Sequence, residues 1–495
     1  MKKLLLLLLA LLLLCSVFAG CKKDDDKNKP DGNQTKAPDN TSTDADEPAY
    51  ELPLKDLGME DGSKREMTIL MPQGRIMQFD ENEANADTIN EAIVKRNDLV
   101  ESKLNCALYY YNPPLNASIM TTMMTAEMLN QTGDYDIVFY EYWWNQEVHG
   151  YFYNLRESEI LALDQPFYNN SWNDAATIRG TLNSLTGYGS IEMMQRTVVT
   201  VFNKSMYNSL FTTPVYDYVH SGDWTLETME IMAKEAYSVE EGGTEVYNYG
   251  LTYDLWAGRA MLFTMGGKVA VMSETEDPII EYASENNLQI LQEMQRFWDE
   301  TYTNFNREDA ATDFVNKKTL FSMTTYGTVE NIRKADSGVT YGLLPYPKLN
   351  LEQKDYISTN TGCSTWSIPV TVESRENAEY LLNTFHYYSA EHVKPAYFDN
   401  VLKGRLASSP DDAEMIDITM DNIYMDFAFI QDTNLSTGCK NDKGQDLAVC
   451  NGTFEIIRGN VSKDFSSFYA ENDALLKQNL ATFIEQYVNG SGSAA

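Results

Sequence analysis

Hydrophobic positions along the first part of the chain recur with two alternating periods, which predicts strands and helices in regular order. The predicted elements are strands at 66–71, 107–111 and 135–140 and helices at 87–104 and 118–129. Strand, helix, strand, helix, strand is the order of a parallel sheet covered by helices. Ligands meet such sheets at the carboxyl ends of the strands, so residues that follow the strands are candidates for a binding site.

A second unit begins near residue 197, with the β-branched run TVVTVFN. It continues with helices at 224–237 and 286–300, strands at 320–324, 339–344 and 364–370, and mainly helical patterns from 376 onward. The body after residue 65 has about 430 residues, which is more than a single hydrophobic core usually serves, so two domains or lobes are expected.

The N-terminus reads MKKLLLLLLALLLLCSVFAGC, with two lysines, a short apolar run and small residues before Cys21. Residues 1–20 therefore form a predicted signal peptide. Phe18 to Cys21 resembles the lipobox of bacterial lipoproteins, which implies that Cys21 carries a lipid; the alternative is an ordinary secretory signal with an incidental cysteine. Residues 21–65 form a predicted disordered tether, and 491–495 a flexible tail. This predicts a protein held by a lipid on the extracellular face of the cell membrane, most readily of a Gram-positive bacterium.

The composition of the chain restricts which partners it can bind and whether it can hold a metal or a cofactor. The chain carries 73 acidic and 38 basic residues, a formal net charge of −35, which argues against nucleic acid or anionic lipid as a partner. Cys439 and Cys450 could form a disulfide or remain two free thiols, and their spacing alone does not decide between these. The sequence has no CxxC motif and no Cys/His cluster, so neither a metal nor a cofactor is expected.

Several segments occur in an order typical of one family: YDIVFYEYWW, TVVTVFNKSMYNSL, GDWTLETMEIMAKEA, YNYGLTYDLWAGRAMLFTMGGK, YGLLPYPK and PAYFDNVLKGRLASSPDDAEMIDI. Together they resemble the extracellular solute-binding proteins of family 1, the lipid-anchored receptors of bacterial ABC importers. The resemblance implies a two-lobed, periplasmic-binding-protein-like α/β fold of type II, with lobes joined by crossing hinge strands. Lobe 1 would comprise 66–192 and 326–370, and lobe 2 would comprise 193–325 and 371–490. Crossings are expected near 195–203, 323–327 and 368–371.

The resemblance also implies a sugar or oligosaccharide as solute, ABC permease subunits as partners, and a monomer. Sugars present an apolar ring face and a rim of hydroxyls, which aromatic and polar side chains bind together. Candidate residues of this kind at the predicted cleft are Arg75, Glu141, Tyr142, Trp143, Trp144, Tyr253, Asp254, Trp256, Tyr326, Ser364, Thr365 and Trp366. Each aromatic has the alternative of a place in the core, and Arg75 that of an exposed loop charge.

Two other functions remain open at the sequence level. A secreted glycan hydrolase needs two opposed carboxylates, which 73 acidic residues do not exclude, although the order of segments does not suggest a barrel. The sequence has no G-x-S-x-G, H-E-x-x-H or P-loop motif, so a binding protein rather than an enzyme is expected. A sensor or adhesion subunit could bind the same solute without serving an importer.

Overall fold

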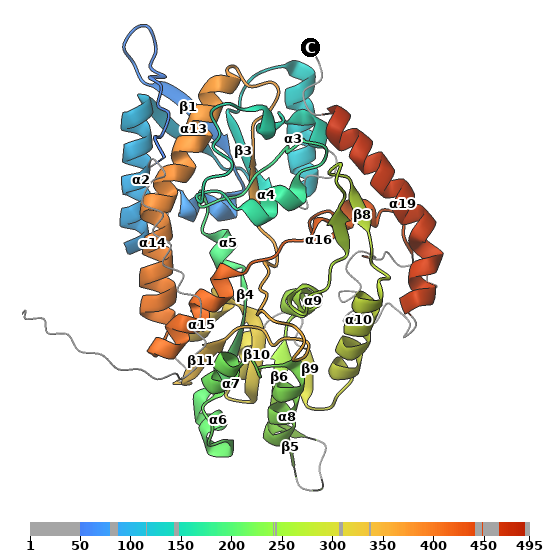
Figure 1. The fold of residues 1–495 in the computed structure, drawn as a ribbon. Helices are drawn as coiled ribbons and strands as arrows, with labels where there is room; N and C mark the ends of the chain where they lie inside the picture. Colours follow the sequence, from blue (N-terminus) through green and yellow to red (C-terminus); the bar gives the residue numbers. More distant parts are fainter. Residues whose placement is uncertain are drawn as a thin grey trace, which may run out of the picture. The chain divides into compact units, whose positions relative to one another are not determined.

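A four-stranded sheet collects strands from distant parts of the chain (Figure 1). The computed structural model describes residues 50–79, 88–114, 116–142, 148–240, 242, 245–305, 310–335, 338–440, 448 and 465–490. The strands of this sheet are β1 (Arg65–Leu70), β2 (Cys106–Tyr111), β3 (Ile137–Glu141) and β12 (Ser364–Ser367). β1 pairs in parallel with β2 and with β3, and β12 runs antiparallel to β3. Helices α2 (Thr88–Leu104) and α3 (Ala117–Asn130) connect the parallel strands, which confirms the predicted order of elements.

A second, six-stranded sheet is built from the middle of the chain. Its strands are β4 (Val198–Asn203), β5 (Ser238–Val239), β6 (Val246–Tyr253), β9 (Thr303–Phe305), β10 (Thr319–Thr325) and β11 (Tyr341–Leu344). The order is β11-β4-β10-β6-β5, and β9 pairs with β6. A separate hairpin consists of β7 (Ala270–Met272) and β8 (Pro278–Ile280). We call the part built on the four-stranded sheet the first lobe and the part built on the six-stranded sheet the second lobe.

Many of the helices begin at a residue whose side chain caps them. The α-helices between β3 and β11 are α4 (Asn170–Ala176), α5 (Glu192–Gln195), α6 (Lys204–Leu210), α7 (Val215–Ser221), α8 (Leu226–Ala236), α9 (Leu255–Thr264), α10 (Glu285–Trp298), α11 (Ala310–Val315) and α12 (Tyr326–Lys334). Those after β12 are α13 (Arg375–Tyr388), α14 (Lys394–Tyr397), α15 (Pro410–Asp421), α16 (Phe427–Ile430), α17 (Asp432–Leu435) and α19 (Phe465–Gly490). Asp254, for example, accepts the N–H of Ala257 at 2.7 Å and so satisfies a free donor at the start of α9. None of the described helices is long and apolar enough to cross a membrane.

Two segments lying side by side connect the lobes. The chain leaves the first lobe through α5 and residues 196–198, and it returns through 358–363 to β12. Thr197 and Asn360 form an antiparallel bridge between the two segments. The N–H of Thr361 donates to the carbonyl of Arg196 at 3.0 Å, so the segments are held together as a hinge. A third connection is the helical run from α13 through the π-helical segments Ser389–Val393 and Phe398–Leu406; it contacts α2 at one end and α12 near the other.

Of the three crossings between the lobes that the sequence predicts, one lies where the structure has a connection and two do not. The crossing expected near 195–203 is present. The crossing expected at 323–327 was wrong, because β10 leads directly into α12, which packs on β10 and β4 within the second lobe. The crossing expected at 368–371 lies earlier, at 358–363, because β12 is already paired with β3.

The predicted lobe boundaries differ from the observed packing at three places. β11 was assigned to lobe 1, but it pairs with β4 in the six-stranded sheet. α13 was assigned to lobe 2, but it packs on α2 of the first lobe. The tether was predicted to reach residue 65, but Leu57 is buried and its N–H donates to Leu104 O at 2.8 Å. The signal peptide 1–20, Cys21 and the tail 491–495 lie outside the described residues.

Candidate functional site

An ion network lies where the strands of the first lobe end and the chain enters the hinge. Arg75 follows β1, Glu141 is the last residue of β3, and Glu192 opens α5. Arg196 immediately follows α5. Because β1 and β3 are parallel neighbours, their carboxyl ends bring Arg75 and Glu141 to the same edge of the sheet.

The four side chains form a continuous chain of contacts. Arg75 binds Glu141 through its Nη2 atom, and its Nε atom lies 2.7 Å from Glu192 Oε1. Arg196 binds both oxygens of Glu141, at 3.1 and 3.3 Å. The other oxygen of Glu192 accepts the N–H of Ser364 at 2.9 Å, which ties the network to the first residue of β12. A carboxylate that is bound on both sides in this way is held in one orientation.

Burial within the network is unequal. The side chains of Glu141 and Glu192 are 7% and 2% exposed, whereas those of Arg75 and Arg196 are 25% and 23% exposed. Burial alone would lower the pKa of Arg196, but the charges of Glu192 and Glu141 outweigh it and raise the pKa above its ordinary value. The guanidinium group of Arg196 therefore stays charged, and both guanidinium groups present a partly open edge that can donate hydrogen bonds to a ligand.

An aromatic cluster adjoins the network through Tyr142, the residue after Glu141. The Tyr142 ring packs edge-on against Trp172 of α4, with 5.2 Å between centroids, and contacts Phe429 of α16 at 6.5 Å. Arg259 of α9 lies over the Phe429 ring at 4.5 Å and over the Trp256 ring at 5.2 Å. Trp256 is 43% exposed, so it offers an aromatic face at the surface of the second lobe. Burial raises the pKa of Tyr142, which keeps its hydroxyl neutral.

The structure therefore brings some of the predicted residues together. Arg75 and Glu141 are members of the ion network, and Ser364 joins it through its backbone. Tyr142 and Trp256 belong to the neighbouring aromatic cluster, in which Phe429 and Arg259 link them. Trp143, Trp144 and Cys450 lie outside the described residues.

Other predicted residues belong to the cores of the lobes, which corrects their proposed role. Trp366 is 1% exposed and packs on Phe139 at 4.5 Å. Tyr326 is fully buried in a core formed by β4, α12 and the helical run after α13. Tyr253 stacks on Trp298 with 5.5 Å between centroids, and Thr365 is fully buried in β12. Asp254 caps α9. Except for Asp254, which is half-buried, these side chains point into packed protein rather than to a surface.

Glu192, Arg196 and Arg259 are site residues that the sequence reasoning missed. A signal for two of them was present, because Glu192 and Arg196 are four residues apart at the start of the predicted crossing at 195–203. Opposite charges at this spacing face the same side of a helical turn.

Cys363 and Cys439 are both buried, so neither offers an exposed thiol to the site. Cys363, next to the network, is a fully buried free thiol, and burial raises its pKa well above the ordinary value. Cys439 is also a buried free thiol. Within the described part of the chain, no three His, Cys, Asp or Glu side chains are grouped as they would be around a metal ion.

Comparison with known proteins supports the architecture but not a family. No protein-family model matches the chain, and no curated protein matches it. Among solved structures, the chain is similar to a cyclo/maltodextrin-binding protein complexed with maltotetraose, with a TM-score of 0.55 and 12% identity over 86% of this chain and 99% of that chain. It is also similar to CpMnBP1 with mannotriose bound, with a TM-score of 0.50 and 13% identity over 84% of this chain and 99% of that chain. The chain therefore has the two-lobed α/β fold of periplasmic-binding-protein type.

Proposed function

We propose that the protein is a solute-binding receptor that takes up a sugar or oligosaccharide between its two lobes. The observation that carries the proposal is the network of Arg75, Glu141, Glu192 and Arg196, built from strand ends of the first lobe and from the hinge itself. Its partly exposed guanidinium groups suit hydroxyl groups, and the exposed ring of Trp256 suits an apolar sugar face. Similar folds bind maltotetraose and mannotriose, which favours the same class of ligand.

A receptor fits these contacts better than a hydrolase. Both carboxylates of the network are tied to guanidinium groups, and Glu192 also accepts a backbone N–H. A glycosidase needs one carboxyl group free to protonate the leaving group. The network instead holds its carboxylates as fixed acceptors, which suits binding without cleavage.

The proposal includes an anchor and a partner. A lipid on Cys21 would hold the protein at the extracellular face of the membrane, and an ABC permease would receive the solute from the closed form. We propose a monomer, because the two lobes of one chain are sufficient to enclose the ligand.

A thermal-shift screen of the purified protein against a glycan panel tests the binding proposal. One class of glycan should raise the melting temperature and be recovered intact. Replacing Glu141→Gln should abolish the shift, because Arg75 and Arg196 lose their common anchor. The matched control is Glu293→Gln, which removes the same charge from an exposed pair on α10 and should leave the shift unchanged. A cleaved glycan would establish the hydrolase instead, and a full shift in Glu141→Gln would remove this network from the site.

A further inference from the structure

A pocket of about 340 Å³ lies beside α4, away from the ion network. Its walls come from three segments that Figure 1 shows next to one another: α4, the β7–β8 hairpin and the segment that leads into α16. Ala175 of α4 lines the pocket, whereas Trp172 of the same helix packs on Tyr142 beside the ion network. Phe427 of α16 also lines the pocket, whereas Phe429 contacts Tyr142. The pocket and the proposed sugar site therefore lie on different faces of α4 and α16.

Hydrogen bonds hold the walls of this pocket in place. Asp426, just before α16, accepts the N–H groups of Val269 at 2.9 Å and of Ala270 at 3.2 Å, which fastens the hairpin to this segment. Ser171 Oγ of α4 accepts the N–H of Met425 at 3.1 Å, which fastens α4 to the same segment. Because the walls are tied together without a ligand, binding costs little ordering of the protein.

The surface inside the pocket is mainly apolar. The apolar residues that line it are Ala175, Ala270, Val271, Met272, Met425 and Phe427. Tyr424 adds an aromatic ring to the same lining. Such a surface favours an apolar or aromatic body, whereas the hydroxyl groups of a sugar would lose their hydrogen bonds to water there.

One charged group at the pocket is available to a ligand. Lys268 Nζ lies 6.0 Å from the centroid of the Tyr424 ring, and no carboxylate of the described residues forms an ion pair with it. Asp174, which also lines the pocket, is paired with Arg156 at 2.8 Å. The side chain of Asn287 binds the backbone N–H and carbonyl of Lys268, at 3.0 and 2.7 Å, and so fixes its position. The pocket therefore presents one positive charge beside an aromatic face.

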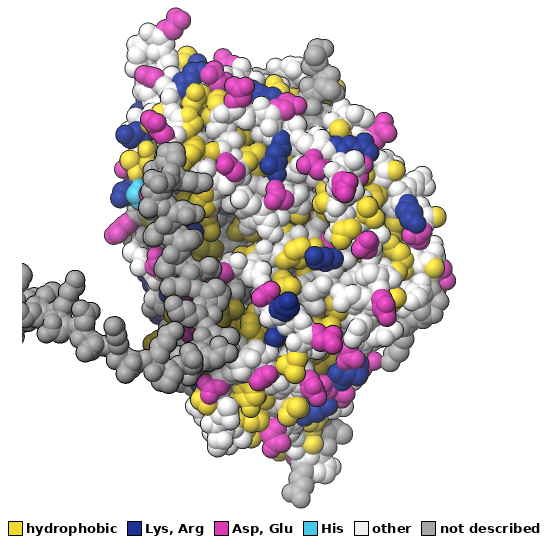
Figure 2. Space-filling model, in the orientation of Figure 1, with side chains coloured by type: hydrophobic (Ala, Val, Ile, Leu, Met, Phe, Trp, Pro, Cys, Tyr) yellow, Lys and Arg dark blue, Asp and Glu magenta, His cyan; other side chains and the backbone are white. Residues whose placement is uncertain are grey.

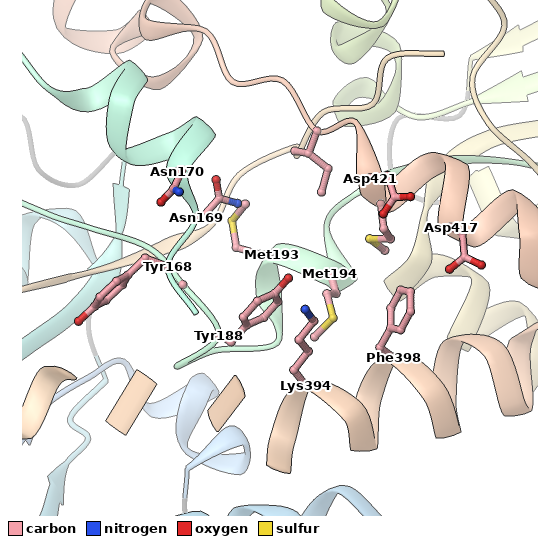
Figure 3. A pocket seen from close by; sticks show the side chains of 13 residues that line it. Tyr168, Asn169, Asn170, Tyr188, Met193, Met194, Lys394, Phe398, Asp417 and Asp421 are labelled. Carbon is pink, nitrogen blue, oxygen red and sulfur yellow. The ribbon is translucent and has the colours of Figure 1, made fainter. Parts of the chain in front are cut away.

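A larger cavity, of about 390 Å³, has a different arrangement of charges. Figure 3 shows that Lys394 lines it together with Asp417 and Asp421. Lys394 Nζ lies 4.2 Å from the centroid of the Tyr188 ring in this lining. Because groups of both signs face that cavity, it does not select an anion, in contrast to the pocket beside α4.

We propose that the pocket beside α4 binds a small aromatic carboxylate. The ring of the ligand packs between the Tyr424 ring and the apolar lining, and its carboxylate pairs with Lys268. The whole chain carries a formal net charge of −35 and so repels anions in general. Selective binding of an acid must therefore come from the local charge of Lys268. This site is independent of the proposed sugar site.

Methyl NMR of the purified protein tests the proposal, because Met272 and Met425 line the pocket and a bound aromatic ring shifts their methyl signals. Titration with 2-naphthoate should shift both signals, with a Kd below about 1 mM. The methyl signal of Met124, in the core of the first lobe, should stay in place. 2-Naphthamide has the same rings without the charge and should bind about tenfold more weakly.

Three substitutions separate the charge from the shape of the pocket. Lys268→Met keeps the apolar stem and should weaken binding of 2-naphthoate about tenfold, while binding of 2-naphthamide stays the same. Lys354→Met, the matched control, removes an exposed lysine that does not line the pocket and should change neither affinity. Ala175→Trp fills the pocket from α4 and should abolish binding of both compounds. If this variant does not fold, Val271→Trp fills the same pocket from β7.

Each outcome decides one part of the proposal. Unshifted Met272 and Met425 signals with both compounds would overturn the site. Equal affinity for the acid and the amide, or full affinity for the acid in Lys268→Met, would overturn its selection of an anion. The experiment uses no sugar, so failure of all glycans to bind would refute the receptor and leave this result standing.

Discussion

Glu192→Gln removes one charge from the ion network while it keeps nearly the same shape. The Glu192 side chain is 2% exposed and makes two contacts, with Arg75 Nε at 2.7 Å and with the N–H of Ser364 at 2.9 Å. Hydrogen bonds to charged groups contribute about 1.5–3 kcal/mol, against about 1 kcal/mol for neutral ones. Because Arg75 is 25% exposed and water partly screens it, we expect a loss of about 2 kcal/mol in the free energy of unfolding.

Urea denaturation at pH 7 and low salt measures this loss, because urea does not screen charges as guanidinium chloride does. The control Glu293→Gln, whose side chain is 43% exposed, should lose no more than about 0.5 kcal/mol. A double-mutant cycle with Arg75→Gln should give a coupling of about 1 kcal/mol. Equal losses in Glu192→Gln and Glu293→Gln, or strict additivity in the cycle, would refute the view that this network fastens the hinge to the first lobe.

Three further predictions concern single side chains. His386 is fully buried and its pKa is lowered to about 3, mainly by burial, so the unfolded chain binds one more proton than the folded one between about pH 3 and 6.5. The contribution of neutral His386 to the free energy of unfolding should thus be complete above pH 6.5 and should be lost as the pH falls toward 3. In urea titrations, His386→Gln should reduce the slope of the free energy of unfolding against pH by about one proton. An unchanged slope would contradict the burial of His386 as a neutral side chain. Trp366→Ala should cost about 3–5 kcal/mol in urea denaturation, because it empties the core around Phe139, and a loss below about 1 kcal/mol would show that the indole is not packed there. Trp256→Ala should cost less than about 1 kcal/mol but weaken glycan binding by about tenfold in calorimetry, and unchanged affinity would remove its ring from the site.

Local patterns in the sequence were sufficient to predict the first sheet, whereas the two-lobed fold was predicted from the resemblance to a known family. Apolar runs and helical spacing gave the elements from β1 to β3 within one or two residues, and their alternation predicted the parallel pairing that the structure has. The lobe boundaries were less accurate, because they depend on pairing between distant segments. β11 joins β4 across more than a hundred residues, and no local pattern in YGLL specifies that partner.

The site was predictable only where it follows a strand. Glu141 and Arg75 were predicted because Glu141 ends β3 and Arg75 lies in the loop that follows β1. Trp366 and Tyr326 were assigned to the site because an aromatic residue fits a sugar face and a core equally well, and burial decides between these only in three dimensions. The surface also gives no simple guide to the site: on the face that Figure 2 shows, acidic, basic and hydrophobic side chains are interspersed.

The five residues EMMQR at 192–196 link the ion network of the first lobe to the paired hinge segments. Glu192 and Arg196 hold the strand ends of the first lobe through Arg75 and Glu141. Met193 also fixes the returning segment, because its backbone carbonyl accepts a hydrogen bond from the side-chain Nδ2 of Asn360 at 2.7 Å. The ion network and the paired hinge segments are therefore both attached to this single turn. Because these contacts share one turn, a substitution that displaces α5 should disturb the ion network and the paired hinge segments together.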